Sequence, residues 1–209
     1  AYARQPFMPI QILAHMANLK SSRINSGNIG FNIAPRINAA GRLAHPNIAL
    51  WLLMAKDEAE ALKQAQELDD LNVKRQSLTQ EAFDEARMVL GDELENNPFM
   101  VMAISNNFPD GILGLVAGKF SQLYHRPAFG IRIHENGQAG GSARSINGFN
   151  IVAALDQCKD ILHRYGGHSQ AAGFSLDAKD IPEFKSRMQA IIEESVAIED
   201  MVPMINIDA

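Results

Sequence analysis

A glycine-rich segment in the second half of the chain carries the side chains best suited to hold an anion. Residues 137–145 have the sequence Gly-Gln-Ala-Gly-Gly-Ser-Ala-Arg-Ser. The glycines allow close approach to the backbone, and the hydroxyls of Ser142 and Ser145 can donate hydrogen bonds. The planar guanidinium of Arg144 matches the geometry of phosphate oxygens. The pattern indicates a site for a terminal phosphate, although a glycine-bearing strand or hairpin with one exposed arginine would have the same sequence features.

A second segment, residues 165–173, has the sequence Tyr-Gly-Gly-His-Ser-Gln-Ala-Ala-Gly. In one interpretation, the backbone N–H groups of Gly166 and Gly167 and the imidazole of His168 lie beside a substrate phosphate or sugar. In the other, the glycines form a left-handed cap at the end of a helix, and His168 is an ordinary hydrogen-bonded neighbour. This segment alone leaves both interpretations open.

The third segment belongs to residues 1–56, which contain no Asp or Glu. Small residues separate Asn38 from Arg42 in the run Asn-Ala-Ala-Gly-Arg, and Arg36 precedes Asn38 by two positions. Without a local carboxylate, a guanidinium here could bind an external anion or could pair with the acidic segment that follows in the chain. Charge alone favours neither.

The chain contains no pattern typical of a self-sufficient catalytic centre. It has no His-Glu-x-x-His run, no Gly-x-Ser-x-Gly run and no phosphate loop ending in Gly-Lys-Ser or Gly-Lys-Thr. The six histidines are not spaced to ligate one metal ion, and the acidic residues are concentrated in helical segments. The sequence therefore lacks the carboxylate cluster that two-metal phosphodiester hydrolysis requires.

The bulk composition is that of an ordinary globular protein. The 209 residues are 46% hydrophobic and 21% charged, with a net charge of −5, so any nucleic-acid contact must come from local clusters of positive charge. Two basic zones, residues 1–56 and 111–155, alternate with acidic ones. No apolar run is long enough to cross a bilayer and no signal-peptide core follows the N-terminus, which predicts a cytoplasmic protein without membrane contact. The single cysteine, Cys158, suits a reducing compartment and is expected to be a small apolar helix residue.

The first half of the chain is predicted to be helical. Helices are expected over residues 10–19 and 46–55, whereas the proline in residues 30–43 predicts an extended or turn backbone and argues against a plain helix there. Asp57 and Glu60 resemble a capping box, and apolar residues recur at helical intervals as far as residue 90. We therefore expect one long connector helix, with a domain boundary near residue 96.

The second half alternates between strands and helices. Strands are predicted over residues 99–104, 127–133, 138–145 and 171–176, and helices over 112–124, 150–164 and 181–195. A further extended segment is expected to begin at Val202. This alternation predicts an α/β domain with helices packed on a mixed sheet.

Five segments together resemble the RecJ exonucleases of the DHH phosphoesterase superfamily. These are residues 33–43, 68–76, 111–118, 141–145 and the Gly-Gly-His-x-x-Ala-Ala-Gly run of 166–173, in the order and rough spacing seen in that family. The Gly-Gly-His run resembles a motif found across the wider superfamily, and the Pro-Arg-x-Asn-Ala-Ala-Gly-Arg run resembles a motif of RecJ itself.

The resemblance implies a domain organisation and a function. Residues 1–56 would be the C-terminal remnant of a metal-binding DHH domain, 57–96 the connector helix, 97–197 a substrate-binding DHHA1 domain, and 198–209 the start of a truncated following domain. The full-length parent would degrade single-stranded DNA from the 5′ end in DNA repair and recombination. It would use Mn²⁺ or Mg²⁺ held by Asp and His residues that this chain lacks, so the chain alone is expected to be inactive.

The resemblance also assigns roles to individual residues. Arg42, Ser142 and Arg144 would surround the 5′-phosphate, with Asn38 supporting the arginine segment, and Gly166, Gly167 and His168 would face the scissile region of the DNA. Arg36 and Ser145 are further candidates for binding the nucleic acid. The implied partners are single-stranded DNA with a 5′-phosphate, single-stranded-DNA-binding protein and a helicase.

The sequence is also compatible with two other functions. A related phosphodiesterase would act on cyclic dinucleotides or very short RNAs, and a related non-catalytic module would bind nucleic acid only. An intact Asp-His-His cluster upstream would distinguish an enzyme from such a module.

Overall fold

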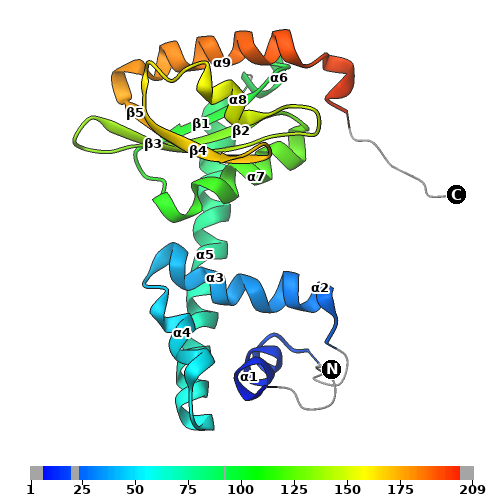
Figure 1. Cartoon of the computed structure of the whole chain (residues 1–209), viewed down its shortest axis with the longest axis vertical. Helices are drawn as coiled ribbons and strands as arrows, with labels where there is room; N and C mark the ends of the chain where they lie inside the picture. The colour runs from blue at the N-terminus through cyan, green and yellow to red at the C-terminus, as the bar shows by residue number, and fades with distance from the viewer. Residues whose placement is uncertain (1–6, 20–23, 92, 203–209) are drawn as a thin grey trace, which may run out of the picture. The chain divides into compact units, whose positions relative to one another are not determined.

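The computed structural model describes residues 7–19, 24–91 and 93–202, and the chain forms two compact units, Ala1–Leu78 and Thr79–Ala209 (Figure 1). The division lies within one long helix, α5, which runs from Glu58 to Leu90. Within the described ranges, no helix combines the length and the apolar character needed to span a membrane.

The first unit is helical. Its elements are α1 (Met8–Met16), α2 (Ser26–Asn28), a π-helical turn (Ile29–Ile33), α3 (Ala34–Leu43), α4 (Asn47–Met54) and the first part of α5. Apolar side chains from these helices form one core, in which Leu13, Leu52 and Leu68 are fully buried. The predicted helix over 46–55 is confirmed as α4. The predicted helix over 10–19 is present but ends at Met16.

Residues 30–43 are helical, first in the π-helical turn and then in α3, so the prediction of an extended or turn backbone was wrong. Pro35 lies in the first turn of α3. There a missing N–H leaves no hydrogen bond unmade, because the first N–H groups of a helix have no partner within it. The proline therefore starts the helix where we expected it to prevent one.

The long helix α5 begins where its cap predicts. The backbone N–H of Glu60 donates to Oδ1 of Asp57 at 2.9 Å, and Oε2 of Glu60 accepts from the backbone N–H of Lys56 at 3.1 Å. The side-chain contact predicted at the helix start is therefore present, and satisfying these N–H groups stabilises this end of the helix.

The second unit is built on a mixed sheet, as predicted, and the sheet has five strands. They are β1 (Val101–Ser105), β2 (Ala128–Ile133), β3 (Gln138–Arg144), β4 (Leu162–His168) and β5 (Ala171–Asp177), in the order β1-β2-β3-β5-β4. Strands β1 and β2 are parallel, and the other neighbours are antiparallel. The helices are α6 (Glu93–Asn96), α7 (Leu113–Tyr124), α8 (Ile151–Asp156) and α9 (Ile181–Ser195), with short 3-10 turns at Asp110–Ile112, Ala178–Asp180 and Ile198–Asp200.

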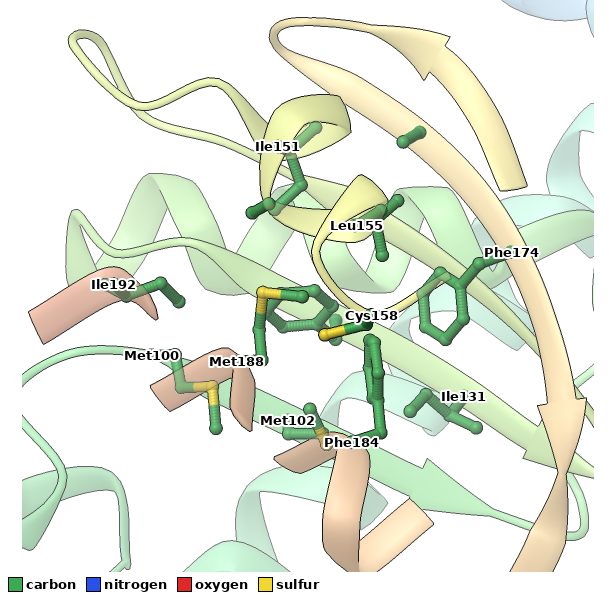
Figure 2. Close-up of a cluster of buried hydrophobic side chains, with 14 of the residues drawn as sticks. Met100, Met102, Ile131, Ile151, Leu155, Cys158, Phe174, Phe184, Met188 and Ile192 are labelled. Carbon is green, nitrogen blue, oxygen red and sulfur yellow. The ribbon is translucent and has the colours of Figure 1, made fainter. Parts of the chain in front are cut away.

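The two faces of this sheet are covered differently. On one face, α8 and α9 enclose the main core, where the rings of Phe174 and Phe184 lie 4.9 Å apart and Cys158 is fully buried (Figure 2). Burial raises the pKa of the Cys158 thiol, which suits the expected apolar role. Cys158 lies in the turn after α8, so the expectation that it is a helix residue was wrong. On the other face, α7 packs on β2 and β3 (Figure 1). Phe120 of α7 packs against Phe83 of α5 with ring centroids 4.6 Å apart.

The predicted helix over 150–164 is wrong beyond Asp156. Its start is confirmed, because the side chain of Asn150 accepts hydrogen bonds from the N–H groups of Val152 and Ala153. After a turn the chain forms β4 instead, which pairs Leu162 with Leu176 of β5. Pairing with β5 overrides the helical spacing of the apolar residues. The extended segment expected from Val202 falls on residues 203–209, which lie outside the described residues.

Candidate nucleic-acid interface

The strand register places most of the predicted site residues of the second unit in two neighbouring rows across the sheet. The first row is Gly130, Ser142, Gly173 and Gly166 on strands β2, β3, β5 and β4. The second row, two residues away along β3, is Ala128, Arg144, Ala171 and His168. Ser142 therefore lies beside Gly173, and Arg144 beside Ala171, although each pair is more than twenty positions apart in the sequence.

The side chains of both rows belong to the face of the sheet on which α7 packs. Successive residues of a strand point to opposite faces, so Ser142 and Arg144 share one face and Ala143 points to the other. Ala143 is fully buried in the core under α8 and α9, which fixes the assignment. Gly166 and His168 follow the same alternation on β4, and both are exposed.

The first turn of α7 lies directly against Arg144 and Ser142. A Cβ atom at Gly114 would be 2.5 Å from Nη2 of Arg144 and 2.9 Å from Oγ of Ser142, so only glycine leaves room for this guanidinium. Nη1 of Arg144 donates to Oγ of Ser142 at 3.2 Å and to the carbonyl of Ala143 at 2.8 Å. The start of a helix also carries unpaired N–H groups and partial positive charge. Guanidinium, hydroxyl and helix start together form an environment for an anion.

Gly114 was missed as a site residue, although the run that contains it was part of the resemblance. The available signal was a glycine inside a predicted helix, which weakens the helix and requires a packing reason. The structure supplies that reason, because the guanidinium of Arg144 occupies the space of a side chain.

The paired glycines of residues 166 and 167 have separate explanations. Gly167 has φ +148° and belongs to a strand, so the helix-cap interpretation is wrong. A Cβ atom there would lie 2.3 Å from the carbonyl oxygen of Ala171, so the backbone itself requires glycine. A Cβ atom at Gly166 would meet nothing within 4 Å, which means that the surface of β4 is open at that position.

Ser145 is engaged within its own loop. Its hydroxyl donates to the carbonyl of Phe149 at 2.6 Å, and its N–H donates to the carbonyl of Gln170 at 2.9 Å. These contacts shape the turn between β3 and α8 and favour a structural role over direct contact with a ligand.

In the first unit, Arg36 is likewise engaged. Its Nε donates to Oδ1 of Asp69 on α5 at 2.7 Å, its Nη1 donates to the carbonyl of Asn32 at 2.6 Å, and its side chain is only 16% exposed. Arg36 therefore pairs with the acidic helix α5, which favours a structural role for this residue.

Asn38 and Arg42 lie one turn apart on α3, where residues four apart share a side of the helix. Arg42 is close enough to Arg75 of α5 for their charges to interact. The pKa of Arg75 is lowered by burial and, to a smaller extent, by the positive charge of Arg42. Nη2 of Arg75 donates to Oδ1 of the buried Asn72 at 2.9 Å. Arg75 therefore adds a second guanidinium near Arg42 that sequence reasoning did not name.

The described residues do not fit a Mn²⁺ or Mg²⁺ centre of their own. Within the described ranges, no group of three or more His, Cys, Asp or Glu side chains is arranged to hold a metal ion.

Comparison with known proteins gives consistent matches. A family model for the DHHA1 domain matches residues 96–194. The single-stranded-DNA-specific exonuclease RecJ of Bacillus subtilis is 40% identical over 186 residues, covering 88% of this chain and 23% of that protein. RecJ of Thermus thermophilus is 35% identical over 189 residues, covering 84% of this chain and 26% of that protein.

Solved structures agree with these sequence matches. The crystal structure of RecJ from Thermus thermophilus in complex with Mn²⁺ has a TM-score of 0.78 at 32% identity, covering 90% of this chain and 27% of that chain. A crystal structure of exonuclease RecJ bound to manganese has a TM-score of 0.72 at 31% identity, covering 93% of this chain and 49% of that chain.

The chain thus spans 23% and 26% of the length of these two curated relatives. Sequence identity and fold agree over nearly all of the chain, which is more than the DHHA1 match alone covers. This chain therefore belongs to the RecJ family and contains the family's DHHA1 domain.

Proposed function

We propose that this chain is the DNA-gripping portion of a 5′-to-3′ single-stranded-DNA exonuclease, and that Arg144 and Ser142 bind the 5′-phosphate. The observation that carries the proposal is the contact of Arg144 with both Ser142 and the first turn of α7, on the face of the sheet that is open at Gly166 of β4. The curated relatives are named as single-stranded-DNA-specific exonucleases, which supports the same assignment.

A terminal phosphate matches the donors at this site. It carries more charge than an internal phosphodiester and offers three strong acceptor oxygens. The guanidinium can donate through its planar fork, and the hydroxyl and the helix start can donate to the remaining oxygens. A hydroxyl at the 5′ end would leave these donors without an anionic acceptor.

The first of the two rows, which contains Gly173 and Gly166, gives the rest of the single-stranded DNA a path across the sheet. Gly173 and Gly166 have no side chains, so the DNA backbone can approach β5 and β4 closely. His168 lies at the end of the neighbouring row, where its imidazole can donate to a phosphate or sugar oxygen. On the first unit, we assign Arg42, Asn38 and Arg75 to backbone contacts.

Hydrolysis belongs to the whole protein in this proposal. The RecJ structures named above contain Mn²⁺, which polarises phosphoryl oxygens and activates water when it is bound. We propose that a DHH domain of the whole protein holds Mn²⁺ or Mg²⁺ and cleaves the strand that these residues bind and orient.

The proposal is tested by measuring the affinity of the purified chain for one single-stranded oligonucleotide with either a 5′-phosphate or a 5′-hydroxyl. We expect tighter binding of the phosphorylated end, with affinity that falls as salt rises, because phosphate contacts release counterions. Equal affinity for the two ends would contradict the proposal.

A further inference from the structure

A hollow whose lining includes the guanidinium of Arg164 lies on the same face of the sheet as Ser142 and Arg144. It has a volume of about 430 Å³, and its lining includes His134, Gly140, His163, Arg164 and Ser175. Gly140, Ser175 and Arg164 form the row next to that of Ser142, two residues further along the strands. Tyr165 and Phe174 point into the core on the other face, so Arg164 and Ser175 point away from it.

Among the residues that the structure describes, the lining of the hollow contains one guanidinium, that of Arg164, and no carboxylate. Arg164 is exposed, and its guanidinium makes no hydrogen bond or ion pair with another residue of the described ranges. The carboxylates nearby already have cationic or imidazole partners. Oδ1 of Asp177 lies 2.9 Å from Nε2 of His163, and Asp110 lies 3.3 Å from Arg132 and 3.5 Å from His134. An anion entering the hollow would therefore meet Arg164 without a competing carboxylate.

The remaining lining groups are suited to an oxyanion. Ser175 offers a hydroxyl, and His134 lies over a residue without a side chain, since a Cβ atom at Gly140 would be 3.5 Å from Nε2 of His134. The guanidinium of Arg164 and the hydroxyl of Ser175 are both donors to phosphate oxygens. No metal or covalent chemistry is needed for such a site.

We propose that this hollow binds an internal phosphate of the same single strand, downstream of the 5′ end. Gly140 is about 7 Å from Ser142 along β3, and Arg164 lies two strands across the sheet, about 10 Å away. The hollow is therefore within reach of a phosphate a few nucleotides from the 5′ end. The inference rests on the proposed function, because it places the 5′-phosphate in the neighbouring row. It adds Arg164 and Ser175 as contacts that neither the sequence nor the family match assigned.

The test compares a ligand that fills only the first site with one long enough to reach the second. Thymidine 5′-phosphate and a 5′-phosphorylated dodecathymidylate are titrated into the native chain, into Arg164→Gln and into the control Lys159→Gln. Lys159 is exposed in the turn after α8, on the opposite side of the sheet, and its replacement removes the same charge. Equal melting temperatures of the three proteins show that the fold is retained, and Ser175→Ala provides a second variant of the hollow.

We expect Arg164→Gln to bind the dodecamer about tenfold more weakly, in line with the loss of one charge-assisted contact. Its affinity for thymidine 5′-phosphate should match that of the native chain, and its salt slope for the dodecamer should be shallower by roughly 0.7. Lys159→Gln should behave like the native chain.

An unchanged dodecamer affinity in both Arg164→Gln and Ser175→Ala would overturn the second site. So would an equal loss in Lys159→Gln, or an equal loss for the mononucleotide. A native preference for the 5′-phosphate in those cases would show that the proposed function stands while this inference fails. Absence of that preference in the native chain would overturn both.

Discussion

The guanidinium of Arg144 occupies space that a side chain at position 114 would fill. The clash that a Cβ atom would make there is with the far end of a flexible side chain, Nη2 of Arg144, at 2.5 Å. The helix around Gly114 would itself favour alanine by about 0.5–1 kcal/mol. Function and stability therefore make opposite demands on this residue.

Gly114→Ala should consequently keep or raise the melting temperature while it reduces the preference for a 5′-phosphate. The matched control is Gly118→Ala, one turn later in α7, where a Cβ atom would lie 4.0 Å from Cγ of Arg144 in ordinary contact. Thermal unfolding and the two-oligonucleotide assay measure both properties. If the Gly114→Ala protein kept the native preference for a 5′-phosphate, binding of the phosphate would not depend on the present position of the Arg144 guanidinium.

Asp177 provides a prediction that depends on pH. Its pKa is lowered chiefly by the hydrogen bond with His163 and to a smaller extent by the charges of His163 and Lys179. A carboxyl whose pKa is lower in the folded state stabilises the fold above its unfolded pKa, and this stabilisation is lost as pH falls through the folded value. Carboxyl-carbon NMR titration should show Asp177 titrating below ordinary aspartates, and His163→Ala should raise its pKa. An unchanged titration in that variant would mean that Lys179 or the backbone lowers the pKa.

At the scale of elements, α7 approaches the sheet at a position that admits no side chain. A Cβ atom at Gly130 of β2 would lie 2.7 Å from the carbonyl oxygen of Leu113, which is backbone and cannot rotate away. Gly130→Ala should therefore lower the free energy of unfolding by about 1–3 kcal/mol, as overpacked cores do. Gly166→Ala on β4 is the control, since that position is open. Denaturant unfolding measures both, and equal stability of the two variants would contradict the close packing of α7.

The sequence predicted most elements because their apolar spacing and caps are local. Asn150 and Asp57 marked helix starts that the structure confirms. The two largest errors in the predicted elements, over residues 30–43 and 150–164, lie where non-local pairing or position within a helix decides the outcome. Strand β4 exists because β5 offers it a partner, and Pro35 is compatible with a helix only because it falls in the first turn.

The candidate site was predictable in its chemistry and not in its geometry. Ser142 and Arg144 were identified from residue type, since hydroxyl and guanidinium groups near glycines suit phosphate. Gly114 and Arg75 were not, because their importance comes from neighbours on other elements. Ser145 and Arg36 have the right chemistry, but their donors are occupied within the fold.

At the scale of the whole molecule, the chain consists of two units that each carry candidate contacts for nucleic acid. The first contributes Asn38, Arg42 and Arg75, and the second contributes the α7 face of its sheet. In the proposed function both bind the strand, and cleavage requires the metal-binding domain of the whole protein.

The purified 209-residue chain should therefore not degrade single-stranded DNA when Mn²⁺ is added. Its sequence has no Asp-His-His run, and the described ranges contain no cluster of potential metal ligands. A gel assay with an end-labelled oligonucleotide measures this. Metal-dependent shortening by the pure chain would show that the chain carries a nuclease centre of its own.

The most direct test of the central claim is a thermodynamic cycle that removes the Arg144 side chain and the 5′-phosphate separately and together. Dissociation constants are measured for the native chain and Arg144→Ala with each oligonucleotide end, and Lys159→Ala serves as the charge control. If Arg144 holds the 5′-phosphate, the two changes should be coupled by about 1.5–3 kcal/mol, and Lys159→Ala should show no coupling. Additive effects of Arg144→Ala and phosphate removal would contradict the account.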